Sequence, residues 1–160
     1  MAFDRYNTPY YNSERYYDPT AGAAIRNAIR KEKEWYNSSA PKEYKKTEDF
    51  PTVFSEFYNK AFGSRENGKP RQMAKKKRIR SYIQTYHYCI TYVDSKDFSI
   101  EKAVAELGLT SDKTVRQVFS ETGNISKVID CYKQWIATGT FRWHTKDRWV
   151  TLDEIRAKEN

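Results

Sequence analysis

The chain has 160 residues, of which 38% are hydrophobic and 16% aromatic, and it carries 29 Lys and Arg against 21 Asp and Glu. This length fits one compact domain with an extension, or two small domains. No apolar run approaches the ~20 residues that span a bilayer, and the N-terminal sequence lacks the basic start and apolar stretch of a signal peptide. We therefore expect a cytoplasmic protein that does not use a membrane.

Nearly all of the net charge lies in one segment. Residues 65–93 contain 8 Lys and Arg and 1 acid, a net charge of +7, whereas the whole chain has +8. A block of one sign creates a local field that attracts polyanions, so the charge favours nucleic acid as a partner.

Residues 1–18 are polar and rich in Tyr, and they show neither helical nor strand periodicity. We expect a disordered or loosely docked arm. Its tyrosines could stack on bases or fill a groove of a partner, and a solubilising tail is the simpler alternative.

Residues 19–70 are expected to form a helical extension. Asp18 can cap a first helix and Pro19 suits its first position. The composition of residues 37–49, with Ser, Pro and many charges, predicts a linker. A second helix is expected after Asp49, with Pro51 near its first turn and a packing face of Phe54, Phe57, Tyr58, Ala61 and Phe62. Two Gly and a Pro in residues 63–70 end it.

The remaining segment, residues 71–160, is predicted to be one domain that begins with a long helix. Its apolar stripe has spacings of 4, 3, 4 and 3 and comprises Ile79, Ile83, Tyr86, Ile90 and Val93. The other face is expected to hold Lys77, Arg80, Gln84, His87 and Thr91. Seven cations around its start are candidates for phosphate contacts: Lys69, Arg71, Lys75, Lys76, Lys77, Arg78 and Arg80.

Two short helices follow, separated by a turn. Ser99 is a suitable N-cap for the first and Gly108 a suitable end; Ser111 or Asp112 can cap the second, and Gly123 stops it. A pair of short helices joined by a Gly-containing turn is typical of a helix-turn-helix.

The stretch "AELGLTSDKTVRQVF" resembles the helix-turn-helix of bacterial winged-helix regulators, and "TVRQ" looks like the GntR family. The resemblance implies that Lys113, Thr114, Arg116 and Gln117 face the major groove of duplex DNA. Such a regulator would be a homodimer on a palindromic site. Because the second helix is neutral, a helix-turn-helix that docks a protein remains the alternative.

The C-terminal part predicts an amphipathic helix over 124–139, a short β-hairpin and a last helix capped by Thr151 with Glu154. In the hairpin, Phe141, Trp143 and either Trp149 or Val150 alternate with polar residues. Arg142, Lys146 and Arg148 would make it a basic wing that touches DNA. A hairpin whose Trp residues close the core is the competing interpretation. The fold class is thus mainly α, with a winged-helix-like domain and a C-terminal hairpin.

No catalytic or cofactor motif is found. Cys89 and Cys131 lie in apolar-periodic segments without a Cys or His partner nearby, and His87 and His144 are far apart, so we expect no metal site and no cofactor. We also find no phosphate loop or nucleophile signature, and we expect a protein that is not an enzyme.

The favoured function is nucleic-acid binding without catalysis. The opening "YYDPTAGAAIRNAIRKEKEW" is loosely similar to small phage and mobile-element proteins of Gram-positive bacteria, and a small basic protein of this kind also looks like some anti-CRISPR proteins. The alternative is therefore an inhibitor that binds a host nuclease, another host protein or an RNA–protein complex.

Overall fold

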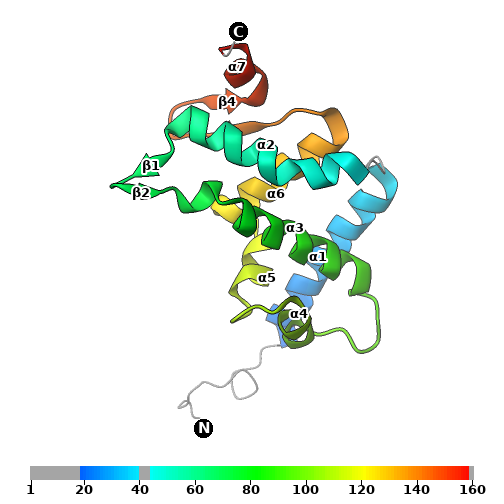
Figure 1. The fold of residues 1–160 in the computed structure, drawn as a ribbon. Helices are drawn as coiled ribbons and strands as arrows, with labels where there is room; N and C mark the ends of the chain where they lie inside the picture. Colours follow the sequence, from blue (N-terminus) through cyan, green and yellow to red (C-terminus); the bar gives the residue numbers. More distant parts are fainter. Residues whose placement is uncertain (1–18, 40–43, 159–160) are drawn as a thin grey trace.

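The computed structural model describes residues 19–39 and 44–158, and the arm predicted for residues 1–18 lies outside this part. The protein is mainly helical with a short antiparallel hairpin near its C-terminus, as predicted (Figure 1). Among the described residues, no helix combines the length and apolarity needed to cross a membrane. The elements are α1 (Pro19–Ser39), α2 (Tyr44–Phe62), β1 (Arg65–Glu66), β2 (Lys69–Pro70), η1 (Gln72–Ala74), α3 (Lys76–Tyr92), α4 (Ile100–Leu107), α5 (Lys113–Val118), α6 (Asn124–Thr138), β3 (Arg142–His144), β4 (Trp149–Thr151) and α7 (Leu152–Ala157).

Helix α3 is the centre of the fold, because α1, α2, α4, α5 and α6 all pack against it. The five residues of its predicted apolar stripe are buried, which confirms the helical periodicity. The opposite face of α3 is less exposed to solvent than predicted. His87 is half-buried, with its Nε2 2.5 Å from Tyr132 Oη, since α1 and α6 cover this part of α3. One cluster of buried side chains runs from Ile25 in α1 to Ile155 in α7.

Helix α1 begins at Pro19, as predicted. Two ion pairs join it to Asp94, just after the C-terminal end of α3. Arg30 Nε and Lys33 Nζ each lie 3.0 Å from a carboxylate oxygen of Asp94. Ile25 and Ile29 are buried on its inner face. Packing and charge therefore act together to hold α1 on α3.

The predicted linker and the start of α2 were wrong. Residues 37–39 belong to α1, and α2 begins at Tyr44, so Pro51 lies inside the helix rather than in its first turn. Pro51 lacks an N–H and costs the helix one backbone hydrogen bond. The buried rings of Phe50, Phe54 and Phe57 offset that cost, since they pack on one another and on Phe141.

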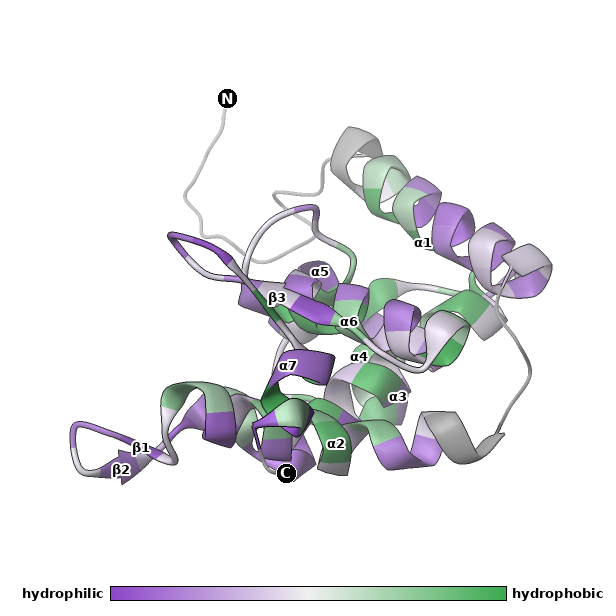
Figure 2. Cartoon of the chain, turned by 90° about the horizontal axis from the view of Figure 1, so that it is seen from above, coloured by the Kyte–Doolittle hydropathy of each residue, from purple (hydrophilic) through white to green (hydrophobic). Residues whose placement is uncertain are grey.

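Residues 63–70 do not only end α2. Strands β1 and β2 form a small antiparallel hairpin there. Asn67 and Gly68 have φ angles of 54° and 78°, the positive values that a two-residue turn of type I′ requires. The Asn-Gly pair is a strong signal for such a turn, and our prediction of a simple break overlooked it. Figure 2 shows that this hairpin and the β3–β4 hairpin both project from the helical body with hydrophilic tips.

Helices α4 and α5 form the two-helix unit expected from the sequence. Ser99 Oγ accepts a hydrogen bond from the Lys102 amide at 3.0 Å, and Gly108 ends α4 in the left-handed conformation with φ 68°. Helix α5 is shorter than predicted, because it ends at Val118 and Phe119 folds back into the core. Gly123, with φ 98°, begins α6 instead of ending α5.

In the β3–β4 hairpin, Trp143 pairs with Val150 and both are buried. Trp143 packs on Phe54 and Tyr58 of α2. Of the two residues left open by the sequence, Val150 enters the core, whereas 46% of Trp149 is exposed. The predicted capping box is present, with Thr151 Oγ1 accepting from the Glu154 amide at 3.0 Å and Glu154 Oε1 accepting from the Thr151 amide at 2.9 Å.

Candidate nucleic-acid interface

The start of α3 presents five exposed cations, Lys75, Lys76, Lys77, Arg78 and Arg80, which we call the α3 basic surface. The local sequence places them there because Ile79 and Ile83 turn the inner face of the helix toward the core. Five of the seven predicted phosphate ligands are thus brought together on one exposed helix end.

No acid balances this surface within the described part of the chain. None of its five cations pairs with a carboxylate there, and the Arg78 guanidinium donates to Gln72, with Nη1 3.4 Å from Oε1. The first turn of α3 contains no acidic residue, and the side chain of the N-cap residue Lys75 makes no capping hydrogen bond. The amide N–H groups of the turn therefore lack backbone acceptors and carry a positive partial charge.

This arrangement is unfavourable in the isolated protein. Cations at a helix N-terminus oppose the helix dipole, and each costs about 0.3–1 kcal/mol at low ionic strength. A phosphate at this position would meet both the ammonium groups and the unpaired amides. The geometry is therefore suited to an anion.

Two other predicted phosphate ligands, Lys69 and Arg71, come before α3, and Arg71 lines a second cavity together with Lys75. Lys69 is exposed on β2, in register with Glu66. The guanidinium of Arg71 donates to the carbonyl oxygens of Gly63 and Phe62 at 2.8 and 2.7 Å, and its Nη1 lies 3.5 Å from Glu66. Arg71 thus closes the C-terminal end of α2, and its donors are already engaged.

Helix α5 carries the four residues predicted to read bases. Lys113 and Arg116 are exposed, and Thr114 and Gln117 are half-buried. Arg116 is paired with Asp112, one turn earlier, with 2.7 Å between Nε and Oδ2. A base contact by Arg116 would require that this ion pair opens.

A polar cavity of about 390 Å³ connects α5 to the α3 basic surface. Arg78 of α3 and Lys113 of α5 both line it, and Thr114 and Gln117 contribute polar groups. The other lining residues are Ser81, Tyr82, Thr110, Ser111 and Ile125. The structure therefore joins one predicted phosphate-binding residue, Arg78, and three of the four predicted base-reading residues in one site.

Ser81, Thr110 and Ser111 were missed by the sequence reasoning. The walls of the cavity come from the start of α3, the α4–α5 turn and α6, which are distant in sequence. Thr110 and Ser111 lie in a turn without periodicity, and Ser81 is one of several polar residues of α3, so only the packing of α5 on α3 identifies the three as cavity residues.

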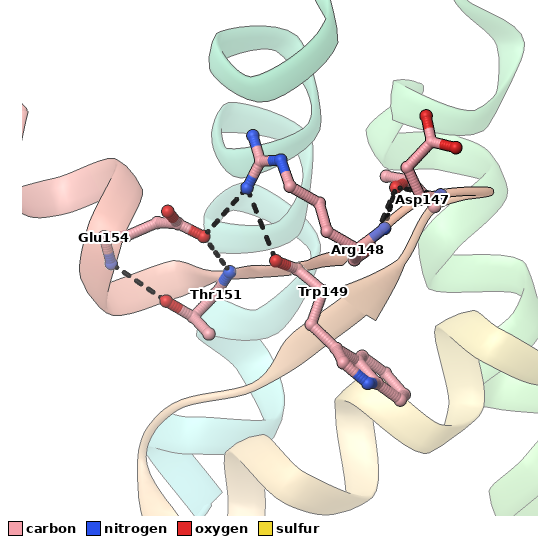
Figure 3. Close-up of polar contacts among 6 residues, drawn as sticks. Asp147, Arg148, Trp149, Thr151 and Glu154 are labelled. Atoms are coloured by element: carbon pink, nitrogen blue, oxygen red, sulfur yellow. Dashed lines mark hydrogen bonds and ion pairs between the residues drawn. The ribbon is translucent and has the colours of Figure 1, made fainter.

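The hairpin cations do not join this site. Figure 1 shows β4 and α7 at the opposite end of the molecule from α4 and α5. Arg142 lies over the Trp149 ring, with Cζ 3.9 Å from its centroid. Arg148 is directed to the other side, toward the Trp149 carbonyl oxygen at 3.4 Å and Glu154 at 3.5 Å (Figure 3). Lys146 is exposed in the turn.

The buried titratable groups are held in their neutral forms. Burial raises the pKa of the Cys89 thiol to about 12 and also raises that of Cys131. Burial likewise raises the pKa of Tyr86, with the neighbouring Glu32 carboxylate adding to the shift. In the described part of the chain, no group of three or more His, Cys, Asp or Glu side chains could hold a metal ion.

Comparisons of the chain with models of protein families, with curated proteins and with solved structures found no match.

Proposed function

We propose that the protein binds nucleic acid, with duplex DNA as its first target, and that it does not catalyse a reaction on it. The observation that carries the proposal is the α3 basic surface, where five exposed cations and an uncapped helix start lack a carboxylate partner in the described chain. In this proposal the surface supplies phosphate contacts, which set the position of the protein on the duplex without reading its sequence.

The helix-turn-helix is part of the same proposal. Helices α4 and α5 contact each other, and both pack on α3, as a three-helix DNA-binding unit requires. Lys113, Thr114 and Gln117 then face the ligand beside Arg78. The β3–β4 hairpin follows α6 rather than α5 and lies at the other end of the molecule, so we do not include it in this interface as a wing.

The test measures affinity for a labelled 20-base-pair duplex by fluorescence anisotropy between 50 and 200 mM salt. We expect affinity to fall steeply with salt, because bound phosphates release counterions. Replacing Lys75, Lys76 and Lys77 together by Ala should weaken binding at least tenfold and lower the salt slope by about 2–3.

The matched control replaces Lys31, Lys96 and Lys158 by Ala. These three are also exposed but lie on α1, in the α3–α4 loop and after α7, so the variant loses the same charge outside the surface. Equal weakening by both triple variants would show that net charge alone attracts the duplex, and would contradict the proposed interface.

A second candidate is a phage inhibitor that binds a host nuclease or nucleoprotein. The Asp112–Arg116 ion pair favours it, because a paired Arg116 leaves α5 with less positive charge to offer a polyanion. In this case the purified chain should recover one dominant host protein from lysate, and nuclease treatment should not remove it.

A further inference from the structure

The outer face of the β3–β4 hairpin carries an exposed indole ring. Trp149 and Tyr92 are the large hydrophobic residues of the described chain that are strongly exposed, at 46% and 50%. The strand register places His144 opposite Trp149, and Arg142 lies two residues before His144 on the same face. Trp143 and Val150 point to the other face, into the core. We call Arg142, His144 and Trp149 the hairpin platform.

The platform is ordered before any partner binds. The guanidinium of Arg142 lies 3.9 Å from the centroid of the Trp149 ring, and the His144 ring lies 4.7 Å away at an angle of 66°. The turn is fixed by Thr145, whose Oγ1 accepts from the Arg148 amide at 3.0 Å and whose amide donates to the Arg148 carbonyl oxygen at 2.8 Å. A ring held in this way loses little conformational entropy on binding.

The surroundings of the ring are cationic rather than apolar. The Arg142 guanidinium lies over the ring, and Lys146 is exposed in the turn that joins the two strands. Asp147 is the one acid of the turn. Figure 3 shows that Trp149 and Arg148 project to opposite sides of β4, so Arg148 belongs to the other face.

This chemistry distinguishes between two kinds of partner. The centre of a protein interface is apolar and depleted of charge, whereas the Arg142 guanidinium lies against the Trp149 ring. An exposed aromatic ring flanked by cations is the combination that binds single strands, because bases stack on the ring and phosphates meet the cations. A duplex cannot use the ring in this way, since its bases are already stacked.

We propose that the hairpin platform binds unpaired nucleotides of single-stranded DNA. The inference rests on the proposed function only in that the chain is a nucleic-acid binder. It adds a second surface, on the β3–β4 hairpin, and a second ligand, the unpaired base, for which the cations of the α3 basic surface do not select.

The experiment uses the full chain and three labelled ligands: (dT)12, (rU)12 and a blunt 12-base-pair duplex. Trp149→Ala should weaken binding of (dT)12 about tenfold or more and leave duplex binding within twofold. Trp149→Phe should restore most of the affinity, because a smaller ring still stacks. Thermal unfolding of each variant checks that the fold is retained.

Tyr92→Ala is the matched control, since it removes the other strongly exposed ring, and it should leave (dT)12 binding within twofold. Equal (dT)12 affinity of the wild type and Trp149→Ala would overturn the inference, and would leave a protein-docking hairpin in its place. A loss confined to (rU)12 would assign the platform to RNA and overturn the DNA assignment.

Failure of the proposed function has a different outcome. In that case the wild type binds neither the duplex nor (dT)12. A third outcome separates the two proposals. If duplex binding depends on Lys75, Lys76 and Lys77 but (dT)12 binding is unchanged in Trp149→Ala, the role of the hairpin platform is overturned and the proposed function stands.

Discussion

Arg116 and Asp112 face each other across one turn of α5, with Arg116 Nε 2.7 Å from Asp112 Oδ2. The ion pair engages one of the two exposed cations of the helix proposed to approach the bases and neutralises its charge locally. Both side chains are about half exposed, so the pair is weak and can open when a ligand competes for the guanidinium.

Asp112→Asn should raise duplex affinity by about two- to fivefold at low salt, because it frees Arg116 and retains a residue that suits the N-cap position. Fluorescence anisotropy on one duplex measures the change. Glu121→Gln removes the same charge just beyond α5 and serves as the control. An equal gain in both variants would show that the ion pair has no special role.

Arg71→Ala should destabilise the protein by about 2 kcal/mol and leave duplex affinity within twofold. The reason is that Arg71 donates two charge-assisted hydrogen bonds to carbonyl oxygens at the end of α2, rather than facing a ligand. Urea unfolding gives the stability. Lys69→Ala, on the neighbouring strand, should change stability by less than about 0.5 kcal/mol. Unchanged stability with a large loss of affinity in Arg71→Ala would return this residue to the phosphate-binding set.

The ion pairs of Arg30 and Lys33 with Asp94, which join α1 to the end of α3, should contribute less to stability at acidic pH. Hydrogen bonds from Lys33 and Arg30 lower the pKa of the Asp94 carboxyl below its usual value of 3.8. A lowered pKa means that the contribution of Asp94 to stability is complete above pH 4 and is lost as pH falls through the folded-state pKa.

The stability difference between the wild type and Asp94→Asn should therefore be larger at pH 5 than at pH 2.5. Urea unfolding at the two pH values tests this expectation. The double replacement of Arg30 and Lys33 by Gln should reproduce the loss at pH 5. A difference that does not change with pH would exclude the ion pairs as its cause.

Both thiols should be unreactive in the native protein at pH 8. Burial raises the pKa of Cys89 to about 12 and also that of Cys131, so neither forms an appreciable amount of thiolate. An aromatic disulfide reagent should label them slowly in buffer and rapidly in 6 M guanidinium chloride. The single variants Cys89→Ala and Cys131→Ala each retain one thiol, so they show which cysteine reacts with the reagent. Fast labelling of one thiol under native conditions would contradict this prediction.

The parts of the fold that depend on local pattern could be predicted from sequence. The stripe from Ile79 to Val93, the Ser99 cap and the capping box of Thr151 and Glu154 all follow from spacing along one helix or one turn. The start of α2 could not be predicted in this way. Pro51 indicated a helix start, but the burial of Phe50 against Tyr132 and Phe141 extends the helix on its N-terminal side.

In the candidate site, too, the features set by local sequence could be predicted and those set by packing could not. The sequence predicted the cations of the α3 basic surface, because charge density needs no knowledge of the fold. It did not predict that Arg71 closes α2 or that Arg116 pairs with Asp112, since these contacts depend on side-chain geometry. Nor did it find the cavity between Arg78 and Lys113, whose walls meet only when α5 packs on α3.

The uncapped, cationic start of α3 has a consequence for the free protein. Helix α3 supports five other helices, so repulsion at its first turn weakens the element on which the rest of the fold depends. A polyanion that neutralises this turn meets the amide N–H groups of the helix only in the native state, so it should bind the native state more tightly than the unfolded chain and raise the melting temperature. Heparin or inorganic polyphosphate, neither of which has bases, would then protect the protein against heat, and dilution into low-salt buffer without a polyanion would bring it closest to unfolding.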